Sequence, residues 1–160
     1  MADKSIYVPR NPQKYLGTNI TRIELKSSWE RSFALFLDNS PSVLGWTYEA
    51  LPTKTLHESG IAYLNPFTGR QTIYKPDFFV VYVDRNNKKH AEVIEIKPLD
   101  EVPPGLGGTR NRTVTKLKEA RQILNAAKFA AAVEHCAKRG WQFRVVTERE
   151  LFKPPARSIR

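Results

Sequence analysis

The chain has 160 residues, of which 41% are hydrophobic and 11% aromatic, which is enough for one domain with its own core. Its 26 Lys and Arg outnumber 16 Asp and Glu, and the net charge of +10 favours a polyanionic partner, nucleic acid first and an acidic membrane surface second. No apolar run approaches the roughly 20 residues that span a bilayer, and the first ten residues lack a signal-peptide core. We therefore expect a soluble intracellular protein.

Cysteine and histidine limit the kinds of metal site that the chain can form. The only cysteine, Cys136, excludes an internal disulfide, and the three histidines are scattered without zinc-ligand spacing. A bound metal would therefore be held by oxygen atoms, which suits Mg²⁺ or Mn²⁺.

Composition divides the chain into three parts. Residues 1–24 contain prolines and basic residues without periodicity, so we predict an extended basic arm, either solvated or placed on phosphate. Residues 25–152 carry the predicted helices and strands and form the single domain. Residues 153–160 are basic and interrupted by proline, and are predicted to be a tail.

The first predicted helix runs from Ser27 to about Asp38, and Asn39-Ser40-Pro41 ends it. Its apolar face is formed by Trp29, Phe33, Phe36 and Leu37. Glu30 follows Ser27 at the spacing of a capping box, so the residues alone favour a role for Glu30 as the capping partner of Ser27.

Strands are predicted at 43–49 and 61–64, followed by two longer strands at 73–83 and 90–97 that form a β-hairpin. The first long strand carries Asp77 directly after Pro76, and the second carries Glu95-Ile96-Lys97, so that Glu95 and Lys97 share a face. Burying such groups costs several kcal/mol each unless they find partners, and neighbouring carboxylates need a cation between them. A divalent metal would meet this need.

The register of the hairpin decides whether Asp77 reaches Glu95. Directly opposed residues in an antiparallel pair have a constant sum of residue numbers, and an even sum such as 172 or 174 places Asp77 on the face of Glu95. A two-residue turn at Asn86-Asn87 gives 173 and separates the two acids. The metal hypothesis therefore predicts an odd loop length or a bulge; the alternative is a simple cross-strand salt bridge.

The remainder of the chain contains the candidate phosphate contacts. Residues 99–115 form a loop rich in Pro and Gly with Arg110 and Arg112 at its tip, which either contacts phosphate or only connects two elements. A long helix is predicted from residue 116 to 139, with Lys116, Lys118 and Arg121 in its first turns as phosphate contacts or solvated charges. A last strand to Val146 and a short capped helix follow.

Pro-Asp followed by Glu-x-Lys on the next strand resembles the motif of the PD-(D/E)xK nuclease superfamily. The resemblance extends in order over SSWERSFALFLDNSPSVLGWTYEALP, YLNPFTGRQTIYKPDFFV, EVIEIKP and NAAKFAAAVEHCAKRGWQFRVVTEREL, which are similar to the head completion nucleases of T4-like bacteriophages. The amino-terminal domain of TnsA-type transposon endonucleases is similar more distantly. This resemblance implies an α/β, restriction-endonuclease-like fold, in which a small mixed sheet is flanked by helices.

The same resemblance implies a metal-dependent endonuclease that hydrolyses phosphodiester bonds in DNA. Asp77, Glu95 and the backbone carbonyl of Ile96 would bind Mg²⁺ or Mn²⁺, and Lys97 would position or help to deprotonate water. Glu30 becomes a candidate ligand because the superfamily commonly supplies an acid from a helix before the sheet. The implied setting is phage head completion or DNA packaging, in the host cytoplasm or the virion head, with capsid, portal or neck proteins as partners and no membrane.

Three other functions stay open. One is a structural head or neck DNA-binding protein with a silent nuclease site, against which the intact acids and lysine argue. Another is a transposon-type or junction-resolving endonuclease, which needs a partner surface that the sequence does not identify. A non-catalytic RNA-binding module is the third, and the lack of a recognisable aromatic RNA-binding motif disfavours it.

Overall fold

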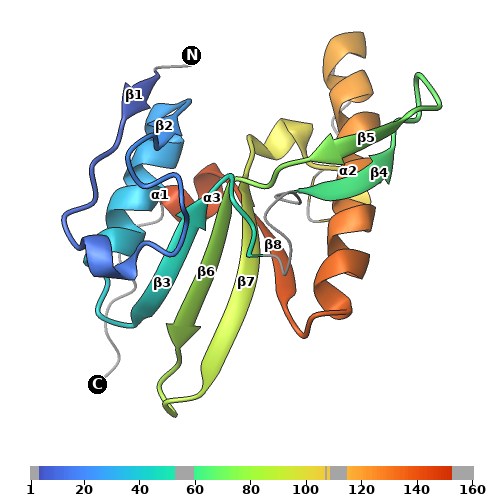
Figure 1. Cartoon of the computed structure of the whole chain (residues 1–160). Coiled ribbons are helices and arrows are strands. Elements are labelled where there is room, and N and C mark those ends of the chain that lie inside the picture. Colours follow the sequence, from blue (N-terminus) through green and yellow to red (C-terminus); the bar gives the residue numbers. More distant parts are fainter. Residues whose placement is uncertain (1–3, 53–59, 107, 109–114, 153–160) are drawn as a thin grey trace.

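A computed structural model describes residues 4–52, 60–106, 108 and 115–152. Its centre is a four-stranded sheet in the order β3-β6-β7-β8, formed by Val43–Tyr48, Phe78–Val83, Lys89–Ile96 and Gln142–Val146 (Figure 1). The first two pairs are antiparallel and β7–β8 is parallel, which confirms the predicted mixed sheet. No helix among the described residues is long and apolar enough to cross a membrane.

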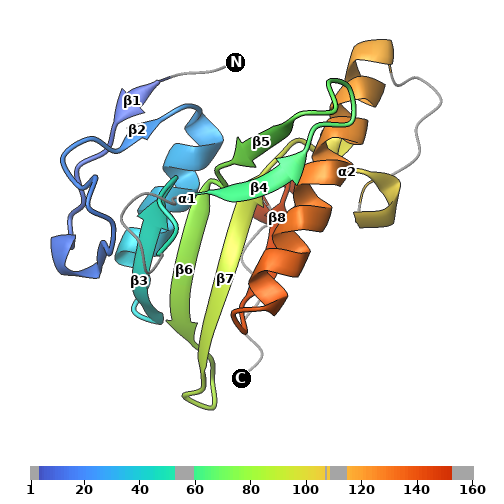
Figure 2. The same ribbon diagram turned by 45° about the vertical axis from the view of Figure 1, so that its right-hand side comes forward.

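The two faces of the sheet carry separate cores, because residues along β6 and β7 alternate between the faces. Helix α1 (Ser28–Asn39) packs on one face, against Phe78, Val80, Ile94 and Ile96. Helix α2 (Lys116–Ala137) and the two-stranded β4–β5 sheet (Ile61–Leu64 and Gln71–Tyr74) pack on the other, against Phe79 and Val93. Figure 2 shows β4 and β5 lying alongside α2.

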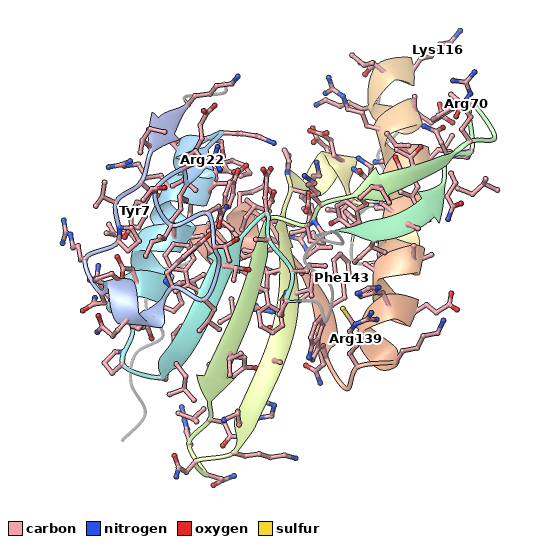
Figure 3. The ribbon with its side chains drawn as sticks, in the orientation of Figure 1. Tyr7, Arg22, Arg70, Lys116, Arg139 and Phe143 are labelled. Carbon is pink, nitrogen blue, oxygen red and sulfur yellow. The ribbon has the colours of Figure 1, made fainter. Side chains whose placement is uncertain are left out.

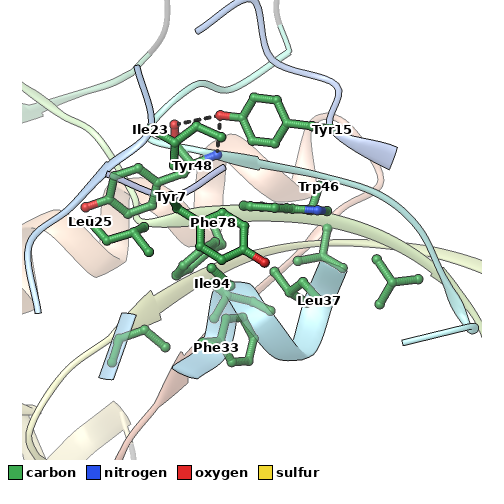
Figure 4. Close-up of a cluster of buried hydrophobic side chains, with 14 of the residues drawn as sticks. Tyr7, Tyr15, Ile23, Leu25, Phe33, Leu37, Trp46, Tyr48, Phe78 and Ile94 are labelled. Carbon is green, nitrogen blue, oxygen red and sulfur yellow. Dashed lines mark hydrogen bonds between the residues drawn. The ribbon is translucent and has the colours of Figure 1, made fainter. Parts of the chain in front are cut away.

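The predicted solvated arm is wrong for the residues that the structure describes. Tyr7, Tyr15 and Ile23 are buried in the α1-side core, and the ring of Tyr15 lies 4.8 Å from that of Trp46 (Figure 4). Short strands β1 (Ser5–Ile6) and β2 (Glu24–Leu25) pair at the ends of this segment, which also contains a 3₁₀ turn, η1 (Pro12–Lys14). Apolar burial fixes the segment although its prolines prevent long regular elements.

The long strand predicted at 73–83 is also corrected. Gln71–Tyr74 pairs with β4, the chain turns at residues 75–77, and β6 begins only at Phe78. Pro76 has no amide hydrogen, and it interrupts the run of strand-forming residues that suggested one continuous strand.

The register prediction is confirmed. The pairs of β6 and β7, such as Phe78 with Ile94 and Val83 with Lys89, have the even sum 172. Residues 84–88 form the loop between the strands, and this odd length replaces the two-residue turn that would separate the acids. Asn87 adopts a φ of 61° in this loop, a conformation that asparagine tolerates better than most residues.

The helices begin and end close to the predicted positions. Ser27 caps α1, and Thr115, at which the sequence predicts no cap, caps α2. Gly140, with a φ of 73°, follows the end of α2. Thr147 and Glu150 form a full capping box on α3 (Glu148–Leu151). Two 3₁₀ turns, η2 (Leu99–Glu101) and η3 (Pro104–Leu106), lead away from the end of β7.

Candidate active site

Asp77 and Glu95 face each other at one end of the central hairpin. Because Phe78 pairs with Ile94, the preceding position places Asp77 opposite Glu95. The amide of Asp77 donates to Glu95 Oε1 at 3.2 Å, and the amide of Ile96 donates to Asp77 Oδ2 at 2.8 Å. The two acids are 8% and 5% exposed, and each carboxylate accepts a backbone hydrogen bond from the segment that carries the other acid.

The surroundings of Asp77 and Glu95 disfavour the state in which both carboxyl groups are ionised. Burial raises the pKa of Asp77 well above its usual range, and the charges of Glu95 and Glu30 raise it further. Burial also raises the pKa of Glu95, although Lys97 and the hydroxyl of Tyr74 act in the opposite direction. A cation at the pair would relieve both the repulsion and the cost of burial.

Each carboxylate keeps one oxygen without a hydrogen bond from the described residues. Glu95 Oε1 accepts from the Tyr74 hydroxyl at 2.7 Å as well as from the Asp77 amide, whereas Oε2 only faces Lys97 Nζ at 3.5 Å. On Asp77, the amide of Ile96 occupies Oδ2 and leaves Oδ1. Two carboxylate oxygens fit Mg²⁺, which often binds one or two carboxylates and completes its shell with water and phosphate.

Glu30 approaches the site from α1 but has partners of its own. Its Oε1 accepts from the hydroxyl of Tyr48 and from the amide of Lys26 at 3.3 Å, and its amide donates to Ser27 Oγ at 3.1 Å. The cap of Ser27 is thus present, but the Glu30 carboxylate bonds the Lys26 amide and not the Ser27 amide. Across the described ranges no three His, Cys, Asp or Glu side chains gather as a metal-binding cluster.

A cleft of about 470 Å³ opens beside these residues. It is lined on one side by the first turn of α1 and on the other by the end of β7 and η2, including Lys26, Glu30, Lys97 and Glu101. Both Glu30 and Lys97 therefore border one space large enough for part of a substrate.

The candidate phosphate contacts on α2 have different surroundings. Lys118 pairs with Asp100, and Arg121 Nε lies 4.0 Å from Glu101 Oε1, so both side chains help to hold η2 against α2. Lys116 is exposed at the amino end of the helix (Figure 3). Arg110 and Arg112 lie outside the described residues.

Two further residues at the site were not predicted from the sequence. The sequence predicts Tyr74 only as a strand residue, whereas in the structure its hydroxyl donates to Glu95. Lys128 of α2 stands over the rings of Tyr63 and Tyr74 and is coupled electrostatically to both acids. The available signal for Lys128 was its isolation, since it is the only charged residue between Arg121 and Glu134.

A mixed sheet whose central hairpin ends in two buried acids and a lysine defines a class of α/β nucleases with a restriction-endonuclease-like fold. The chain belongs to the family of TnsA-like endonuclease N-terminal domains, whose model matches residues 40–148. It is 29% identical over 152 residues to the head completion nuclease of Enterobacteria phage T4, covering 92% of this chain and 93% of that protein. Asp77, Glu95, Lys97 and Lys128 fall within the matched range of the family, and Glu30 precedes it.

Proposed function

We propose that this nuclease is a metal-dependent DNA endonuclease that hydrolyses phosphodiester bonds. The observation that carries the proposal is the pair of buried acids, Asp77 and Glu95. Each accepts a backbone hydrogen bond from the segment that carries the other, and each keeps an oxygen free of hydrogen bonds from the described residues. This donor set suits Mg²⁺, and Mn²⁺ prefers the same hard oxygen ligands.

The side chains divide the work of the site. Asp77, Glu95 and the carbonyl of Ile96 would hold the metal, with Glu30 assisting from α1. When bound, the divalent cation supplies Lewis-acid stabilisation of negative charge on the phosphate. Lys97 orients the attacking water and, as an ammonium group beside the acids, stabilises negative charge that develops on the phosphate oxygens.

The net charge and the cleft support DNA as the substrate. With +10 over 160 residues, the protein attracts a polyanion before any specific contact forms. The cleft between α1 and the end of β7 gives a DNA strand access to Lys97 and Glu30, which line it. Lys116, which is exposed, would contact a more distant phosphate.

Similarity over most of its length to a phage head completion nuclease supports a biological setting. We infer that the protein processes packaged DNA ends or completes filled phage heads, in the host cytoplasm or in the virion head. Capsid, portal or neck proteins would then be its partners.

Incubation with supercoiled and linear duplex DNA tests this function. The wild-type protein should cut with Mg²⁺ or Mn²⁺ and not with EDTA, because the two acids need a cation to act on phosphate. Asp77→Asn and Glu95→Gln should each lower the rate on the order of 10³-fold, while DNA binding is retained.

Glu134→Gln is a matched control, because Glu134 is exposed near the far end of α2 and pairs only with Lys138. It should cut like the wild type. Cleavage that survives EDTA, or full cleavage by Asp77→Asn, would contradict the proposal.

A further inference from the structure

Lys128 occupies an unusual position in α2, on the side of the site away from α1. The surrounding stretch of the helix is rich in alanine, with Phe129 and Ala132 buried against the sheet. Lys128 is only partly exposed, and its Nζ lies 5.9 Å from the ring centre of Tyr63 and 5.7 Å from that of Tyr74. Both tyrosines come from the β4–β5 sheet, which lies alongside α2 (Figure 2). The ammonium group of Lys128 therefore faces that sheet.

Tyr74 connects this lysine to the acids. One face of its ring receives the ammonium group of Lys128, and its hydroxyl donates to Glu95 at 2.7 Å. Burial and the nearby charge of Lys97 lower the pKa of Lys128, whereas Glu95 and Asp77 act to raise it. Lys128 and Lys97 therefore form two positive positions around the same pair of carboxylates.

Unlike its neighbours, Lys128 has no ion-pair partner within the described ranges. Lys97 lies 3.5 Å from Glu95, Lys26 lies 2.5 Å from Glu49, and Lys118 pairs with Asp100. A partly buried ammonium group that contacts aromatic rings, with carboxylates acting on it only from beyond ion-pair distance, is less well compensated than one paired with a carboxylate. An anionic group of a ligand could pair with the Lys128 ammonium group without displacing an ion pair within the protein.

We propose that Lys128 binds a phosphate of the DNA substrate next to the scissile phosphate, on the side of the site formed by α2 and the β4–β5 sheet. This inference rests on the proposed function, which supplies DNA as the anion. Lys128 contacts the ring of Tyr74, whose hydroxyl binds Glu95, whereas Lys97 lies beside Glu95 itself, so Lys128 holds a flanking phosphate and not the group under attack. It is a substrate-binding residue, and Lys97 remains the lysine of the chemical step.

The test measures the affinity of the full chain for a short duplex DNA in EDTA, over a series of salt concentrations. Lys128→Met should weaken binding about 5- to 10-fold and reduce the log–log salt slope by about 0.9, the value for one phosphate contact. With Mg²⁺ added, KM should rise in parallel while kcat changes by less than about threefold. Lys128→Arg should restore affinity and slope.

Lys88→Met is the matched control, because Lys88 is exposed in the loop at the opposite end of the hairpin from Asp77. It removes the same charge and should leave the salt slope within error of the wild type. Should Lys128→Met fail to fold, Lys128→Gln carries the same test with a polar side chain. Thermal unfolding of every variant separates loss of contact from loss of structure.

The outcomes separate this inference from the proposed function. If the wild type binds and cuts DNA but Lys128→Met behaves like Lys88→Met, the role of Lys128 is refuted and the nuclease function stands. A lower melting temperature with an unchanged salt slope would show a purely structural role and also refute it. If the wild type neither binds nor cuts DNA, both proposals fall.

Discussion

Two buried aspartates in this protein have opposite surroundings. Asp38, at the end of α1, is fully buried, and its carboxylate accepts hydrogen bonds from the Tyr7 hydroxyl at 2.6 Å and from the amides of Arg10 and Asn11 at 2.7 and 3.0 Å. Burial alone would raise the pKa of Asp38, but these donors outweigh it and the pKa is lowered. Hydrogen bonds from the protein therefore compensate the buried charge of Asp38.

Asp77 is similarly buried but receives far less compensation. It accepts one hydrogen bond, from the amide of Ile96, and it faces a second acid, Glu95, so its pKa is raised by burial first and then by neighbouring charge. The difference shows that burial of an acid does not by itself indicate function. An acid whose oxygens all accept hydrogen bonds is part of the fold, whereas a buried pair of acids with few hydrogen-bond donors is a candidate cation site.

The largest expected effect on stability comes from a substitution of Asp38, the acid assigned to the fold. Asp38→Asn places an NH₂ group against amide donors and should cost about 3 kcal/mol of unfolding free energy, measured by urea denaturation. Its cleavage per folded molecule should be unchanged, because the substitution is outside the site. Asp77→Asn should show the reverse, with stability in EDTA equal to or above that of the wild type and almost no cleavage.

The pH dependence of Asp38 gives a check on this prediction. A lowered pKa in the folded state stabilises the protein above the unfolded value of about 3.9, and this contribution is lost as pH falls through the folded pKa. The stability difference between wild type and Asp38→Asn should therefore shrink from about pH 5 towards pH 2. A constant difference would show that the charge of Asp38 is not the source of the effect.

Glu30 is intermediate between Asp38 and Asp77, because its carboxylate accepts hydrogen bonds and also borders the site. Glu30→Gln keeps one oxygen that can accept from both the Lys26 amide and the Tyr48 hydroxyl, as Oε1 does now, but removes the charge. Turnover should therefore fall about 10²-fold, or roughly 2.7 kcal/mol, at an unchanged melting temperature. Cleavage equal to that of the wild type would remove Glu30 from the catalytic set. It would leave Asp77, Glu95 and Lys97 to carry the reaction.

The smallest predicted effect is metal binding without DNA. At about ten times its Kd, Mg²⁺ should stabilise the wild type by about 1.4 kcal/mol, detected as a rise in melting temperature. Asp38→Asn should keep this increment and Asp77→Asn should lose it, since only the second carboxylate belongs to the proposed site. An equal rise in both variants would point to metal binding elsewhere on the surface.

The sequence was informative wherever a local pattern has a single geometric consequence. Alternation along the hairpin predicts that Glu95 and Lys97 share a face, and an even sum of paired residue numbers is the condition that places Asp77 with Glu95. The caps at Ser27 and Thr147 likewise correspond to helix starts in the structure. These features depend on contacts between near neighbours or within one hairpin.

Features that depend on distant contacts were missed. The segment around Tyr7 has no regular pattern, and its burial follows from a partner, Asp38, that is 31 residues away. Ile73 and Tyr74 resemble strand residues continuous with β6, and only the pairing with β4 reveals their separate sheet. The sequence predicts Lys128 only as a charged residue on a helix, and its contacts with the rings of Tyr63 and Tyr74 arise from the tertiary fold.

The separate cores on the two faces of the sheet allow one side of the site to unfold locally while the other stays folded. Local unfolding of α2 together with β4 and β5 would expose Phe79 and Val93 but leave the core around α1 intact. Such an opening would carry Tyr74 and Lys128 away from Glu95 while Glu30 stayed on the sheet. The amides of α2, β4 and β5 would then exchange hydrogen together and independently of those of α1. Substrate DNA that contacts both α1 and α2 would slow exchange most in α2, β4 and β5.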